Sequence, residues 1–529
     1  MTLTAQKFEN RLLAHHFFPR IAKRGDEFPP CFVSGDLTQT ISNRLQAVKV
    51  SRPNGYGAIS LRATRFDLAP RNMEVLHPRA YAELVRALRV SWSKWSEIKD
   101  NRSSALRMTD HQDGRVFSMI EHEPAEDLLY TGGRFKAKVD ISNFYGSIYT
   151  HSIPWAVYGT VQAKRIQDDK SEWTNVLDMK VRQTRRTETT GISIGPGTSA
   201  IIGEIILGAV DKRLQQHPSV KNSKRRPIRF IDDYEFVSDS RDEAEDFVRA
   251  VRDELSTLKL SIHPTKTTIV QLPKPLLPRW MRQLRLTQRG PKTLEKLLDL
   301  LDQALDAEDG VGEEGELRYA LVAVEGELLR DDADDEMKCS IADRLLNIGY
   351  LRPVAVASAC RILNTLDHLE IAERADDLDQ ILQEHVANGR TDSATWAMYS
   401  LIKADVPLSP NAMNSVVASR DCLALALLTL SEAGMDRVEE FLTTLESRSP
   451  MDYERDEYWL LYYLCALDST RFRPAPDSYY LELKPLLDAN VRFIDLEATN
   501  NYKPYHKTSV RPAVARQGGT PGGRSPYAG

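Results

Sequence analysis

The chain has 529 residues, of which 42% are hydrophobic and 27% charged, a composition typical of soluble globular proteins with room for several domains. Its five cysteines lie far apart without a CxxC pair, which excludes a zinc ribbon and a dense disulfide framework and favours a reducing cytoplasm. No signal peptide or membrane span is expected, because residues 1–20 lack an apolar core and the longest uncharged stretch, 141–163, is rich in polar residues.

The small net charge of -5 is the balance of two opposed parts. Residues 1–290 hold 46 Lys and Arg against 33 Asp and Glu, a net of +13, whereas residues 291–529 hold 24 against 42, a net of -18. This asymmetry predicts that the first part meets a polyanion and that the second does not.

The first pattern with chemical content is a predicted strand over 135–141. Hydrophobic residues alternate there with Lys136, Lys138 and Asp140, which indicates a half-buried strand with a carboxylate near its end. Such a carboxylate can hold a hard divalent cation. Taken alone, the pattern also fits an ordinary surface aspartate.

A glycine-rich loop and a predicted apolar helix follow. Residues 191–199 contain three glycines, Gly195 among them, and an apolar helix is expected over 201–210. A base pair or a sugar could pack against such a loop, and a plain loop before a core helix is the alternative.

The next pattern is a predicted hairpin over 229–237. Hydrophobic β-formers flank Asp232 and Asp233, which places two adjacent carboxylates at a tight turn. A bound Mg²⁺ would relieve their repulsion, as two-metal phosphoryl transfer requires. The alternative is that Asp-Asp serves only as a turn dipeptide. An amphipathic helix over 244–255 and a segment ending in Lys266-Thr267 come after it.

After Pro291 the pattern becomes a series of amphipathic helices separated by Pro, Gly or Asp-rich breaks. Their spacing of roughly 35–40 residues is typical of stacked helix pairs. An array of helical repeats is therefore expected, with an irregular helical bundle as the alternative. The Gly/Pro-rich end of the chain is expected to be largely disordered.

Asp140, the glycine-rich loop, the Asp232-Asp233 hairpin and the Lys266 segment stand in the order of the palm motifs of reverse transcriptases, and residues 30–285 resemble that family. The sequences Phe-Ile-Asp-Asp at 230–233 and Gly-Pro-Gly-Thr-Ser at 195–199 are similar to those of the abortive-infection (Abi) polymerases of bacterial phage defence. The expected fold class is therefore α+β, with reverse-transcriptase fingers and palm over 1–290, an all-α helical-repeat domain over 291–500 and a largely disordered tail over 501–529.

The resemblance implies a role for each motif residue. Asp140 and Asp232 would bind two Mg²⁺ ions with the carbonyl of Ile141, and Asp233 would be the third catalytic and metal-binding carboxylate. Tyr145 would exclude a ribose 2′-hydroxyl and so favour dNTPs. The remaining nucleotide-binding candidates are Arg65, Arg71, Gly195 and Lys266.

The resemblance further implies an anti-phage DNA polymerase in the bacterial cytoplasm that assembles as a homo-oligomer and contacts no membrane. It would extend a protein primer with dNTPs without a template, giving single-stranded DNA attached covalently to the protein. The acidic part after residue 290 supports the untemplated interpretation, because a thumb that grips a duplex is usually basic. The alternatives are an RNA-templated reverse transcriptase of a retron-like defence system and a non-enzymatic protein with a relic palm.

A priming hydroxyl must reach the catalytic carboxylates from mobile chain. Tyr56, in the turn Pro53-Asn-Gly-Tyr-Gly, is the predicted primer because most other tyrosines stand in apolar helical or strand contexts. Tyr502 and Tyr505 are the rival candidates.

Overall fold

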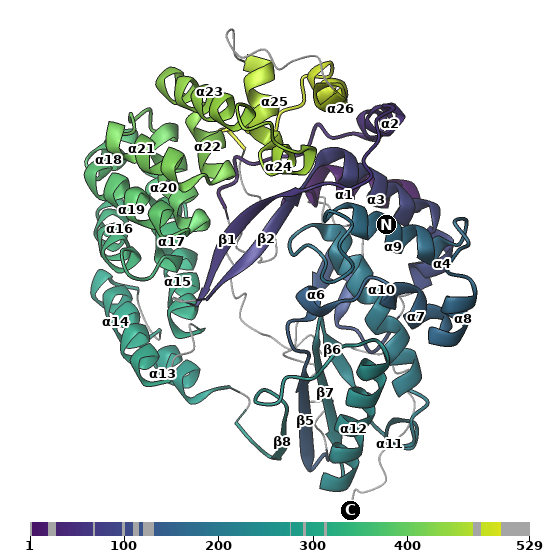
Figure 1. Cartoon of the computed structure of the whole chain (residues 1–529). Helices are drawn as coiled ribbons and strands as arrows, with labels where there is room; N and C mark the ends of the chain where they lie inside the picture. Colours follow the sequence, from purple (N-terminus) through teal and green to yellow (C-terminus); the bar gives the residue numbers. More distant parts are fainter. Residues whose placement is uncertain are drawn as a thin grey trace, which may run out of the picture.

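A four-stranded antiparallel sheet forms the centre of the α+β part (Figure 1). The structure is a computed structural model that describes residues 3–19, 28–66, 69–97, 101–108, 110, 116–119, 132–275, 277–288, 292–311, 315–468 and 478–498. In spatial order the strands are β6 (Ile228–Phe230), β7 (Asp233–Ser238), β5 (Phe135–Asp140) and β8 (Thr268–Gln271). Ala137 and Val139 are buried while the alternate residues of β5 are half exposed, as the alternation predicted.

Two long helices support this sheet. α12 (Arg241–Thr257) packs against β5 and β7, with the ring centroids of Phe247 and Phe236 4.7 Å apart. α10 (Gly197–Leu214) is buried around most of its circumference, as expected for an interior helix. The other helices of this part are α6 (Phe144–Ser147), α7 (Ser152–Tyr158), α8 (Thr160–Arg165), α9 (Trp173–Gln183) and α11 (Pro218–Lys221).

The N-terminal segment (residues 3–97) combines helices with a long hairpin. The hairpin consists of β1 (Ala58–Phe66) and β2 (Ala69–Leu76), which pair antiparallel with an irregularity between Ala63 and Phe66. The helices are α1 (Ala5–His15), α2 (Gln39–Ala47), α3 (Pro78–Val90) and α4 (Trp92–Trp95). A short separate hairpin follows, formed by β3 (Leu106–Met108) and β4 (Phe117–Met119).

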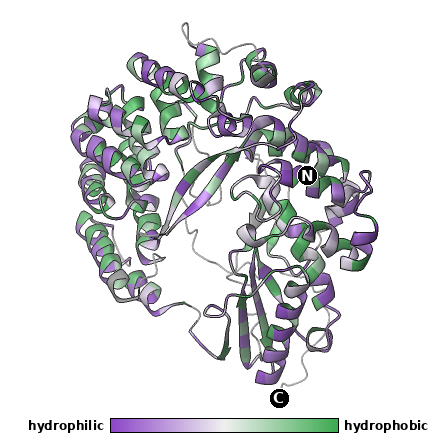
Figure 2. Cartoon of the chain, viewed as in Figure 1, coloured by the Kyte–Doolittle hydropathy of each residue, from purple (hydrophilic) through white to green (hydrophobic). Residues whose placement is uncertain are grey.

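The rest of the described chain is a helical array (α13–α26), as the amphipathic pattern predicted. Figure 1 shows these helices as an arc that starts with α13, to the left of the central sheet in this view, and ends with α26 beside α2, and Figure 2 shows hydrophobic and hydrophilic residues alternating around them. α13 packs on α14 and α15, so the array begins a little before the predicted boundary at residue 290. The members are α13 (Arg279–Thr287), α14 (Leu294–Val311), α15 (Gly315–Leu328), α16 (Asp335–Gly349), α17 (Val354–Leu363), α18 (His368–Ala372), α19 (Ala375–Ala387), α20 (Thr391–Lys403), α21 (Pro410–Ser419), α22 (Cys422–Leu428), α23 (Glu432–Glu446), α24 (Asp452–Asp456), α25 (Trp459–Asp468) and α26 (Ser478–Leu487).

Neighbouring helices of the array pack in successive pairs. α14 packs on α15, α16 on α17 and α19 on α20, and each pair also touches the next one. This arrangement agrees with the expected stacking of helix pairs, although the repeat in the sequence stays a prediction. None of the described helices is long and apolar enough to cross a bilayer.

The end of the helical array closes back onto the N-terminal segment. The amide of Val33 donates to the carbonyl of Phe493 (2.9 Å), and the amide of Asp495 donates to that of Cys31 (2.8 Å). Beneath these bonds the ring of Phe493 lies 5.1 Å from Trp459 and 5.9 Å from Phe17, measured between centroids. The described part of the chain therefore forms a closed circuit, in which the segments around Phe17 and Phe493 share one core.

The array also covers the second edge of β1. The amide of Arg62 donates to Thr391 Oγ1 (3.1 Å) and that of Thr64 to Asp392 Oδ2 (2.6 Å). The carbonyl of Thr64 accepts from Arg318 Nη2 (2.8 Å). Because an uncovered strand edge invites pairing with other chains, these side chains both satisfy and protect the hairpin.

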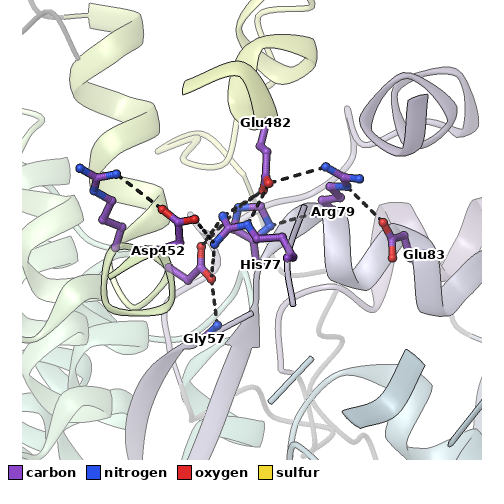
Figure 3. A network of polar contacts seen from close by, with 9 residues as sticks. Gly57, His77, Arg79, Glu83, Asp452 and Glu482 are labelled. Atoms are coloured by element: carbon purple, nitrogen blue, oxygen red, sulfur yellow. Dashed lines mark hydrogen bonds and ion pairs between the residues drawn. The ribbon is translucent and has the colours of Figure 1, made fainter. Parts of the chain in front are cut away.

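A buried charged cluster joins the same two parts of the chain. Arg52 donates to Glu482 through Nε (2.8 Å) and Nη2 (3.0 Å), and its Nη2 also donates to Asp456 Oδ1 (3.2 Å). Asp456 Oδ2 accepts from the amide of Gly57 (2.9 Å). Figure 3 shows the acidic side chains of the array directed at Gly57, His77 and the N-terminal end of α3. We call Arg52, His77, Asp456 and Glu482 the junction cluster; their side chains are all at most 7% exposed.

Candidate functional site

The three predicted carboxylates meet at one end of the central sheet. Asp140 is the last residue of β5 and lies directly opposite Asp233, the first residue of β7. Asp232 precedes it in the two-residue turn that connects β6 to β7. The predicted hairpin is confirmed, with its tip at Ile231 and Asp232, because Asp233 already pairs with Phe230.

Two lysines flank these acids. Lys138 Nζ lies 3.6 Å from Asp233 Oδ2, and Lys266 Nζ lies 3.7 Å from Asp140 Oδ2. Burial raises the pKa of Asp233 to about 6; Lys138 opposes this rise, whereas the negative charges of Asp232 and Asp140 add to it. A carboxyl group whose pKa is raised by burial and by neighbouring acids is typical of sites that bind a cation or transfer a proton.

Tyr145 stands beside the carboxylates, as its position after Asp140 predicted. Its hydroxyl has a pKa raised by burial and by the negative charge of Asp232, and the positive charges of Arg229 and Arg71 oppose that rise. Gly203 of α10 leaves room for the aromatic rings of α6, since a Cβ there would lie 3.1 Å from Phe144 and 3.7 Å from Tyr145. Asp232 and Arg71 of β2 thus both lie near enough to Tyr145 to act on its hydroxyl.

The order of these elements matches a known enzyme family. Residues 104–294, about a third of the chain, match the family model described as "Reverse transcriptase (RNA-dependent DNA polymerase)". The chain contains a reverse-transcriptase domain. It is a nucleotidyltransferase domain, and proteins that contain it bind nucleic acid and nucleotides.

Comparisons with whole proteins add little to this assignment. Apo telomerase from Candida tropicalis aligns with a TM-score of 0.32 and 10% identity over 80% of this chain and 73% of that one. Telomerase from Candida albicans in complex with a fragment of telomeric RNA aligns with a TM-score of 0.26 and 12% identity over 73% and 66%. No curated protein matches the sequence.

Reverse-transcriptase domains generally use divalent metal ions, which steady the charge of the transferred phosphate. Among the described residues, no three His, Cys, Asp or Glu side chains already converge as a metal cage. The chemistry of the donors nevertheless fits such an ion, because Asp233 Oδ1 is buried without a hydrogen-bond partner next to two further carboxylates. Asp140, Asp232 and the carbonyl of Ile141 would hold the metal, with Asp233 as the third carboxylate.

Gly195 and Arg65 were also predicted to contact the nucleotide. The space beside Gly195 is filled by Pro19, whose Cβ would lie 2.3 Å from a Cβ at this position, and its backbone has φ = 124°. Packing and backbone conformation therefore account for this glycine, and its contact with a nucleotide stays a prediction. The side chain of Arg65 lies outside the described residues.

The prediction that Tyr56 is a mobile priming residue is wrong. Its side chain is 2% exposed and stacks on the ring of His77 at 4.8 Å, with the guanidinium of Arg52 4.7 Å from the ring. The backbone is fixed as well, because the amide of Tyr56 donates to Gln183 (2.8 Å). Burial also raises the hydroxyl's pKa, which opposes its use as a nucleophile. Tyr502 and Tyr505 lie outside the described residues.

The sequence analysis missed one buried group beneath the hairpin that carries Asp232 and Asp233. Arg229 of β6 is fully buried and pairs with Glu204 and Asp211, which lie seven residues apart on α10. The detectable signal was the spacing of these two acids, which places them on one face of an otherwise apolar helix.

Proposed function

We propose that this protein is a Mg²⁺-dependent DNA polymerase of the reverse-transcriptase type that adds dNTPs to a hydroxyl group. The observation that carries the proposal is the cross-strand pair of Asp140 and Asp233 beside Asp232. Tyr145 supports a preference for deoxyribonucleotides, because it follows Asp140 at the position of the sugar-excluding aromatic of the resembled family and its hydroxyl lies within the electrostatic reach of Asp232. Lys266, whose Nζ lies 3.7 Å from Asp140 Oδ2, would meet the charge of a leaving pyrophosphate.

We further propose that synthesis is untemplated, that it starts on the protein and that it serves bacterial phage defence. Two features support this. The motif sequences resemble those of the abortive-infection polymerases, and the domain is followed by an acidic helical array instead of a basic thumb. With Tyr56 buried, the priming hydroxyl must come from another residue, and Tyr502 and Tyr505 are the candidates to test.

The decisive experiment incubates purified protein with labelled dNTPs and Mg²⁺ in the absence of nucleic acid. Under this proposal a DNA smear stays with the protein until protease is added, and Asp232→Asn abolishes the signal. Mass spectrometry of the labelled peptide identifies the primer, and Tyr502→Phe and Tyr505→Phe test the two candidates. Loss of phage protection in a plaque assay with Asp232→Asn tests the biological role.

A second function, RNA-templated DNA synthesis as in retron-like systems, is favoured by the family model, whose description is that of an RNA-dependent DNA polymerase. It predicts incorporation only when an RNA template with a primer is supplied. Incorporation that follows the template sequence would decide for this alternative.

A further inference from the structure

The tip of the catalytic hairpin has an unfavourable backbone conformation. Ile231, which precedes Asp232, has φ = 55°, in the left-handed region. A β-branched residue is rarely found there, since its side chain collides with the backbone, and such residues persist only where the surrounding structure holds them. The turn that presents Asp232 therefore needs an external restraint.

Arg229 supplies that restraint. Its Nη1 donates to the carbonyl of Ile231 (2.8 Å) and to Glu204 Oε1 (2.7 Å). Nη2 donates to Glu204 Oε2 (3.0 Å) and Asp211 Oδ2 (2.8 Å), and Nε also donates to Asp211 (3.1 Å). All five N–H groups of the guanidinium thus have acceptors, which a lysine with one nitrogen could not reproduce.

The acceptors are themselves fixed in the core. Asp211 Oδ2 also accepts from Asn101 Nδ2 (2.6 Å). The backbone of Arg229 is held on both sides, because its amide donates to Ser103 (2.6 Å) and its carbonyl accepts from Ala105 (2.8 Å). The position of the Ile231 carbonyl is therefore determined by α10 and by the segment around residue 103.

We propose that Arg229 is a positioning residue that holds Ile231 in its left-handed conformation and so fixes Asp232 where it can bind metal. This inference rests on the proposed polymerase function and adds to it a residue that touches neither nucleotide nor metal. A buried group with this role acts on the rate of nucleotide transfer more than on dNTP binding, because misplacing a reacting group by about 1 Å costs on the order of a hundredfold in rate.

The test compares Arg229→Lys in two backgrounds, wild type and Ile231→Gly. Glycine adopts positive φ without strain, so the turn in Ile231→Gly no longer depends on Arg229. In the wild-type background we expect Arg229→Lys to lower kcat about 10- to 100-fold and to leave the KM for dNTP within about twofold. Mn²⁺ binding, measured by electron paramagnetic resonance, should weaken about tenfold. In the Ile231→Gly background the same change should lower kcat less than about threefold.

Arg361→Lys is the matched control, since Arg361 is likewise buried and paired with an acid, Glu325, but lies in α17. It should leave kcat and Mn²⁺ binding unchanged. If Arg229→Lys does not fold, the apolar combination Arg229→Met, Glu204→Met and Asp211→Leu replaces it, because a whole buried ion network can be exchanged for apolar residues of similar volume at little cost.

The inference is overturned if folded Arg229→Lys keeps kcat within about threefold of wild type. It is also overturned if Arg229→Lys lowers kcat equally in the wild-type and Ile231→Gly backgrounds. Failure of the proposed function is a separate result, since wild-type protein would then incorporate no dNTP. Mn²⁺ binding by Arg229→Lys, Ile231→Gly, their combination and Arg361→Lys would still test the role of Arg229.

Discussion

Replacing Arg52 with methionine should release the helical array from the N-terminal segment. Arg52 is 7% exposed and faces two carboxylates, Asp456 and Glu482, that are 0% and 1% exposed. Methionine keeps much of the aliphatic volume but leaves both acids without their main partner. His77 cannot replace it, because its burial, which the substitution leaves in place, and the neighbouring Arg79 lower its pKa far below the usual value.

The size of the effect follows from the burial of these acids. Removing one partner of a buried ion pair costs about 3–5 kcal/mol, whereas an exposed pair is worth about 1 kcal/mol or less. If this cost lowers the free energy needed to separate the helical array from the N-terminal segment, the amides that bond between these two parts should lose protection from hydrogen exchange roughly 100- to 5,000-fold.

Hydrogen–deuterium exchange measures this directly. The amides of Val33, Gly57 and Asp495 bond across the junction and should lose protection, while those of β5 should keep it. Arg249→Met is the control, because Arg249 is 52% exposed and pairs with Asp246 on the surface. Unchanged exchange at the three junction amides in Arg52→Met would refute the idea that the cluster holds the circuit closed.

Three further predictions concern the catalytic site. Asp232→Asn should abolish dNTP incorporation while the thermal unfolding midpoint stays close to wild type, since the residue lies in a half-exposed turn; residual activity near wild type would remove it from the site. Because Asp233 has a pKa raised to about 6, its charged form is lost as the pH falls through 6, so incorporation at fixed metal should decline between pH 7.5 and 5.5, and a flat profile would contradict this. Tyr145→Val should admit rNTPs by opening space at the sugar, measured as the ratio of kcat/KM for dNTP and rNTP, and an unchanged ratio would make Tyr145 a packing residue.

The sequence predicted what depends on local pattern. The alternation over 135–141 and the Asp232-Asp233 turn each define a strand end, and antiparallel pairing then brings Asp140 and Asp233 together. Lys266 was expected to bind nucleotide from the resemblance of its motif; its Nζ lies 3.7 Å from Asp140 Oδ2, and nucleotide binding stays a prediction. The helices after residue 290 were predictable for the same reason, because the helical spacing of their apolar residues can be seen without knowing which element each helix packs against.

What failed depends on residues far apart in the chain. Tyr56 stands in a Pro-Asn-Gly turn that indicates a mobile loop, yet its ring is enclosed because Arg52 beside it binds Asp456 and Glu482 from the helical array. Arg229 was overlooked for the opposite reason: it resembles an ordinary strand residue until Glu204 and Asp211 are placed beneath it. Local pattern carries no information about which distant acid lies opposite a given arginine.

The closed circuit has a consequence for how the protein is made. Val33 is bonded to Phe493, 460 residues later, so the first core to be synthesised is completed by nearly the last residues described. At about 5–20 residues per second the ribosome needs roughly 20–90 seconds to supply that partner. Phe17 and its apolar neighbours lack the ring of Trp459 until residue 459 is made and that of Phe493 until residue 493 is made. The second edge of β1 lacks its cover until Thr391 and Asp392 are made. The nascent chain therefore carries an open strand edge until residue 392 is made and an exposed apolar surface until residue 493 is made, a period during which a chaperone that binds apolar surface would protect it from aggregation.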